Sequence, residues 1–77
     1  MTVCFLRTAS DYLEDAVKFK TIGDAKADFE ATARELDRYG QHIEAAIHIA
    51  PTLAEVVEYP DYVLSIGPKG GLVCERT

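Results

Sequence analysis

The chain has 77 residues, a formal net charge of −5 and a hydrophobic fraction of 48%. This length predicts one domain, residues 1–77, and the hydrophobic fraction is too high for a disordered chain. The acidic balance argues against direct nucleic-acid binding, which depends on Lys and Arg. No apolar run approaches the roughly 18 residues of a membrane span. The first residues also lack a secretion signal, so we expect a cytoplasmic protein that makes no membrane contact.

Two short strands are expected before residue 21. Val3–Thr8 is rich in β-prone residues, and Ala16–Lys20 alternates, with Val17 and Phe19 on one face. The polar segment Ser10–Asp15 between them is turn-like. The two strands can therefore pair as a hairpin whose loop is longer than the tight types.

The segment Thr21–Gly40 predicts one amphipathic helix. Thr21 can cap its N-terminus, and Gly40 can adopt the left-handed conformation that closes a helix. Apolar residues recur at intervals of three or four and line one face. These are Ile22, Ala25, Phe29, Ala33 and Leu36. A helix with a single apolar face needs a partner surface, which the flanking strands are expected to supply.

The segment His42–Ala50 alternates as a strand does and is expected to end at Pro51. Its Ile side is expected to lie under the helix, and its other side is expected to be a solvated face. The members of the first side are Ile43, Ala45, Ile47 and Ile49, and those of the second are His42, Glu44, Ala46 and His48.

The last third of the chain predicts a hairpin. Thr52–Glu58 fits either a short helical turn or β-structure, and residues 59–61 interrupt it. Tyr62–Ile66 and Leu72–Arg76 are expected strands, joined by the turn Gly67–Gly71. The full order, strand–strand–helix–strand–strand–strand, predicts an α+β fold with one helix on one face of a four- to five-stranded, largely antiparallel sheet.

No catalytic, metal or cofactor site is expected. His42 and His48 would lie about 20 Å apart along one strand, too far to share a metal ion. Cys4 and Cys74 are expected to be reduced thiols, and they can form a bridge only if the first and last strands are neighbours. The pattern of acidic residues does not indicate a pair of carboxylates in a pocket that could act as general acid and base. We therefore expect a protein that is not an enzyme.

The most informative stretch for binding is residues 55–62, which we name the acidic-aromatic loop. It combines carboxylates with tyrosines around a proline and contains no basic residue. Tyrosines suit interfaces, and carboxylates complement a Lys- or Arg-rich partner. The alternative is a connecting loop whose Tyr rings pack on the sheet edge. The candidate partner-binding residues are Glu55, Glu58, Tyr59, Asp61 and Tyr62, with Lys69 at the exposed tip of the next turn.

In size, charge and expected architecture the whole chain resembles small anti-CRISPR and related anti-defence proteins of phages and plasmids. No motif carries this resemblance, so it assigns no functional residue. It implies a non-enzymatic inhibitor, acting in the host bacterial cytoplasm, that occupies a basic surface of a Cas or other defence nucleoprotein complex. The alternative is a homodimeric accessory protein of a mobile element, because a small core and exposed sheet edges favour self-association.

Overall fold

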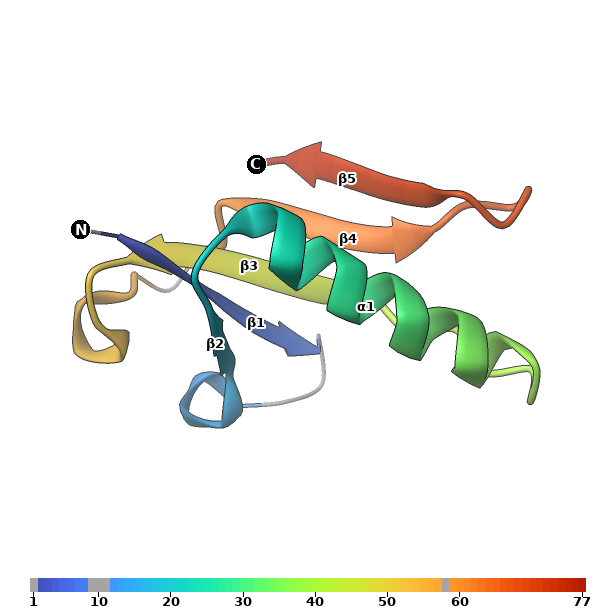
Figure 1. Ribbon diagram of the computed structural model, residues 1–77, viewed down its shortest axis with the longest axis horizontal. Helices are drawn as coiled ribbons and strands as arrows, with labels where there is room; N and C mark the ends of the chain where they lie inside the picture. Colours follow the sequence, from blue (N-terminus) through green and yellow to red (C-terminus); the bar gives the residue numbers. More distant parts are fainter. Residues whose placement is uncertain (1, 9–11, 58) are drawn as a thin grey trace.

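A computed structural model describes residues 2–8, 12–57 and 59–77. The predicted α+β fold is confirmed: one helix packs on a five-stranded antiparallel sheet (Figure 1). The elements are β1 (Val3–Thr8), the 3-10 helix η1 (Leu13–Asp15), β2 (Val17–Phe19), α1 (Ile22–Asp37), β3 (Ala45–Ala50), the 3-10 helix η2 (Leu53–Glu55), β4 (Tyr62–Ile66) and β5 (Leu72–Arg76).

The strand order in the sheet is β2-β1-β3-β4-β5, and every neighbouring pair is antiparallel. The chain leaves β2 at one edge, crosses one face as α1 and returns as β3 in the centre of the sheet. In the register, Leu6 of β1 lies opposite Ile47 of β3, which in turn lies opposite Tyr62 of β4. The crossover therefore places the longest strands, β1 and β3, side by side under the helix.

Local sequence signals define the ends of α1. The Thr21 hydroxyl accepts a hydrogen bond from the Asp24 backbone N–H at 3.1 Å, which satisfies a donor that has no partner within the helix. After the last turn, Gly40 adopts a φ of +74°, a conformation that favours glycine. The predicted caps are both confirmed.

The core lies between α1 and the sheet. Ala25, Phe29 and Ala33 are buried on the inner face of the helix, while the ends of the predicted stripe, Ile22 and Leu36, are only half-buried. Sheet residues complete the cluster, and these are Cys4, Leu6, Ala45, Ile47 and Leu64. The small side chains of Ala25 and Ala33 allow the helix to approach the strands closely.

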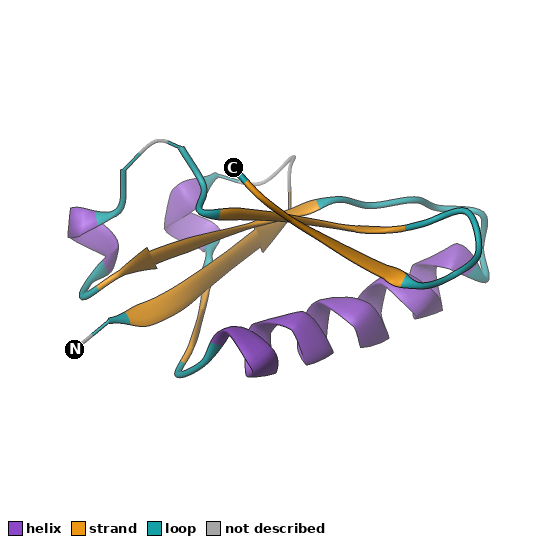
Figure 2. Cartoon of the chain, turned by 90° about the horizontal axis from the view of Figure 1, so that it is seen from above, coloured by secondary structure: helices purple, strands orange, loops and turns teal. Residues whose placement is uncertain are grey.

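The expectation of a solvated face opposite the helix is wrong. Figure 2 shows α1 on one side of the sheet and both 3-10 helices on the other. His48 is 1% exposed and Ala46 7% exposed. His42 and Glu44 are exposed because β3 begins only at Ala45. Connecting segments thus give the sheet a second buried layer.

Strand order also decides the state of the cysteines. Cys4 lies in β1 and Cys74 in β5, and two strands separate β1 from β5. Three strand spacings amount to roughly 14 Å, whereas a disulfide needs Cα atoms within about 7 Å. The condition for a bridge is therefore not met, and both thiols are free.

Candidate functional site

Hydrogen bonds to the sheet anchor the end of the acidic-aromatic loop. The Ile49 backbone N–H donates to Asp61 Oδ2 at 2.7 Å, and the Asp61 N–H donates to the Ile47 carbonyl at 2.8 Å. The Thr77 N–H donates to the Asp61 carbonyl at 3.1 Å, and its hydroxyl donates to the Pro60 carbonyl. Asp61 therefore ties together β3, the loop and the end of β5.

The start of the loop is held by η2. Leu53 accepts a backbone hydrogen bond from Val56, and the Thr52 hydroxyl donates to Glu55 Oε2 at 3.2 Å. Between the two anchors, Tyr59 is 77% exposed and Val57 is 67% exposed. With so much of its ring exposed, the tyrosine does not pack on the sheet edge, and Glu55 at the start of the loop is exposed as well.

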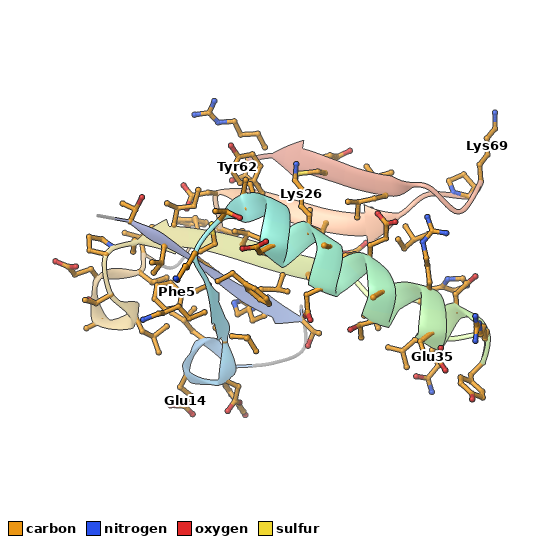
Figure 3. All side chains as sticks on the ribbon, in the orientation of Figure 1. Phe5, Glu14, Lys26, Glu35, Tyr62 and Lys69 are labelled. Carbon is orange, nitrogen blue, oxygen red and sulfur yellow. The ribbon has the colours of Figure 1, made fainter. Side chains whose placement is uncertain are left out.

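The structure separates the remaining candidates. Tyr62 is half-buried in β4 and packs against the core under the helix. Figure 3 shows Lys69 at the far tip of the β4–β5 turn, well away from Tyr62. Glu58 lies outside the described residues. Among the described candidates, Glu55 and Tyr59 are exposed on the loop, whereas the Asp61 carboxylate is engaged in holding β3.

A cleft that the sequence did not indicate lies where the β1–β2 pairing stops. It has a volume of about 120 Å³ and opens between α1 and the β1–β2 edge. Apolar residues line it, namely Leu6, Val17, Phe29, Ile43 and Ala45, and its charged lining residues are Asp15, Asp28 and Arg7. An opening of this size fits one long side chain with an apolar stem and a cationic end. Only the crossover of α1 past β2 brings these residues together.

A second hollow, at the C-terminal end of α1, is lined by Arg34, Arg38 and Ile66 among others. Both arginines already pair with neighbouring glutamates on the helix, at 3.2 Å for Arg34–Glu30 and 3.4 Å for Arg38–Glu35. These exposed pairs contribute little to stability, but they reduce the net positive charge at the hollow.

His48 is the buried polar group of the second layer. Arg7 Nε donates to His48 Nε2 at 3.1 Å, so Nε2 acts as an acceptor and the neutral ring carries its hydrogen on Nδ1. Nδ1 is buried and has no hydrogen-bond partner among the described residues. A buried imidazole in this arrangement is held in its neutral form.

The pKa of His48 reflects this environment. Burial lowers it below the ordinary value of 6.5, and the positive charge of Arg7 lowers it further. The backbone of Val57 and Tyr59 and the carboxylate of Asp61 act in the opposite direction but do not reverse the shift. Protonation of Nε2 would also remove the acceptor that Arg7 uses.

We expect the free energy of unfolding to fall as the pH drops below 6.5, because the unfolded imidazole takes up a proton that the folded one resists. His48 can change the free energy of unfolding by at most about 1.4 kcal/mol per pH unit. His48→Gln should remove this part of the pH dependence. His42→Gln, at a histidine whose side chain is 84% exposed, should leave it intact. Urea unfolding at several pH values measures both, and equal slopes for the two variants would contradict the assignment.

Within the described part of the chain, no three His, Cys, Asp or Glu side chains lie close enough together to hold a metal ion. In the same part, no helix combines the length and the apolar character needed to cross a membrane. Sequence reasoning missed the exposure of Val57, the cleft beside α1 and the burial of His48. Compared with known protein families, curated protein sequences and solved structures, the chain matches none of them.

Proposed function

We propose that this chain is a non-enzymatic protein-binding inhibitor that occupies a basic surface of a nucleic-acid-handling bacterial defence complex. The observation that carries the proposal is the display of Tyr59 and Val57 on a loop anchored at both ends. Exposed aromatic side chains are frequent anchors of protein interfaces. Because hydrogen bonds hold both ends of the loop, less conformational entropy is lost when a partner binds it than for a free segment.

The acidic charge of the chain indicates which kind of partner it prefers. The net charge of −5 and the exposed Glu55 favour a surface rich in Lys and Arg, such as one that otherwise holds nucleic acid. The cleft lined by Asp15 and Asp28 offers a second place for a basic side chain of the same partner. The acidic balance of the chain disfavours phosphates, so the chain would exclude nucleic acid from the surface that it covers.

The test uses a purified CRISPR effector complex loaded with guide RNA, with binding of target DNA as the readout. The chain should reduce DNA binding, and added salt should weaken its effect because the attraction is electrostatic. The double variant Glu55→Lys/Tyr59→Ser should lose affinity for the complex by about 30-fold or more, the size expected when a central anchor is removed. Asp61 is left unchanged because its carboxylate holds β3.

The chain offers a matched control at the end of α1. Glu35 and Tyr39 have the same spacing as Glu55 and Tyr59, and Tyr39 is 74% exposed. The variant Glu35→Lys/Tyr39→Ser therefore makes the same changes elsewhere and should bind as the original chain does. Equal affinity of the two double variants would exclude the loop as the binding surface, and no effect on any effector complex would count against the inhibitor function.

A further inference from the structure

The last strand of the sheet has a free hydrogen-bonding edge. The Gly67 N–H donates to the Gly71 carbonyl at 2.8 Å, and the Thr77 N–H donates to the Asp61 carbonyl at 3.1 Å. These bonds flank the β4–β5 ladder, in which Leu64 lies opposite Cys74. Since hydrogen-bonded and non-hydrogen-bonded pairs alternate in an antiparallel ladder, residues 73 and 75 bond to β4.

It follows that the N–H and C=O groups of residues 72, 74 and 76 point away from β4. β5 is the last strand in the sheet order, so no strand from the described part of the chain lies on this side. A row of unpaired backbone groups on an edge strand is a template for another strand. The opposite edge differs, because β2 has only three residues, of which the middle one is the charged Lys18, and Lys20 follows directly after it. The five-residue β5 is therefore the edge open to pairing.

From this edge we infer that two copies of the chain pair through antiparallel β5 strands, with a two-fold axis at Cys74, to form a continuous ten-stranded sheet. This inference is independent of the proposed function. In this register Cys74 faces Cys74 of the second copy, Leu72 faces Arg76, and Val73 faces Glu75. All five residues of β5 pair, and every outward N–H and C=O finds a partner.

Other symmetric registers are poorer. An axis at Glu75 places two carboxylates directly opposite each other, which is destabilising in a strand pair. An axis at Val73 brings Arg76 opposite Gly70, whose φ of +82° belongs to the turn and not to a strand. The register centred on Cys74 is the longest, and it has no like charges directly opposite.

The side chains suit this arrangement. Leu72 and Cys74 are half-buried and pack at the margin of the core, so a second copy extends an apolar layer that is already present. The stem of Arg76 can cover Leu72 of the second copy while its charge stays in water. On the other face, Val73 is 36% exposed and gains cover from the partner strand. An interface of one strand is small, so we expect a dissociation constant in the micromolar range.

Sedimentation of the purified chain across micromolar concentrations should show a monomer–dimer equilibrium. Cys74→Asp and Cys74→Lys should each be monomeric, because each places two like charges at the axis, and an equimolar mixture of the two should form a heterodimer. Formation of this heterodimer is expected only if the two residues 74 face each other at the axis. It also shows that both variants are folded, because unfolded chains could not pair in this way. A strictly monomeric original chain, or a mixture of the two folded variants that stays monomeric, would overturn the inference.

Crosslinking tests the register separately. A short bifunctional maleimide should join two copies through Cys74, and Cys74→Ser should abolish the product. Cys4 serves as an internal negative control, because it is buried and its burial raises its pKa. In the Cys74→Ser background, Val73→Cys mixed with Glu75→Cys should crosslink more strongly than either variant alone. Equal yields from the mixture and the single variants would contradict the register.

Discussion

Phe29→Ala should lower the free energy of unfolding by about 3–5 kcal/mol, the loss typical of a fully buried Phe. Phe29 lies in the middle of α1, is 2% exposed and belongs to the cluster that joins the helix to the sheet. The substitution removes the ring from contact with that cluster, and the helix carries no second large side chain that is fully buried. Chemical denaturation measures the effect through the midpoint at constant slope.

This loss is large relative to the total free energy of unfolding of the domain. At about 0.05–0.15 kcal/mol per residue, a domain of this size has roughly 4–12 kcal/mol of stability. The variant should therefore melt at least about 12 °C lower than the original chain. Glu35→Ala is the matched control, because it lies on the same helix with its side chain 59% exposed and loses only a surface ion pair. Similar losses for both variants would mean that the helix does not pack through Phe29.

Ile47→Ala should cost about 2–5 kcal/mol, and Ile47→Val about 0.5–1.5 kcal/mol. Ile47 is 0% exposed in the central strand β3, with Leu6 opposite it on one side and Tyr62 on the other. Removing its methyl groups leaves a cavity that three strands and the helix would have to close. Comparing Ile47→Ala with Ile47→Val separates a loss of packing from a change in strand propensity, because only the packing loss scales with the number of atoms removed.

Ile49→Ala provides the comparison on the same strand and the same face. Ile49 is 38% exposed because it lies beyond the cover of the core cluster, so its truncation should cost clearly less than that of Ile47. Urea denaturation of both alanine variants gives the difference directly. Equal losses would show that the helix-bearing face of β3 is buried to its end, contrary to the structure.

The sequence predicted the elements well where their signals are local. The segment Thr21–Gly40 contained α1 with both caps, and the strands Val3–Thr8, Tyr62–Ile66 and Leu72–Arg76 have the predicted bounds. Periodicity, capping and turn residues act over a few positions, so they can be recognised without knowing the rest of the fold. The α+β class followed from the order of these elements.

The candidate site was predictable only in part. The composition of residues 55–62 singled out the loop, and its Tyr59 is exposed as binding requires. Composition could not show that Tyr62 faces the core or that the Asp61 carboxylate holds the Ile49 N–H. Both depend on the register of β4 against β3, which contacts between distant segments determine.

By itself, then, the sequence determined the helix, the five strands and their order along the chain, the amphipathic face of α1 and the acidic balance of the protein. Only the tertiary structure decided that β3 lies between β1 and β4, and that β5 is left with a free edge. It also decided that His48 is buried, because two connecting segments cover the face that alternation alone marks as polar. Alternation assigns side chains to one of two faces, but the segments that cover each face come from elsewhere in the chain.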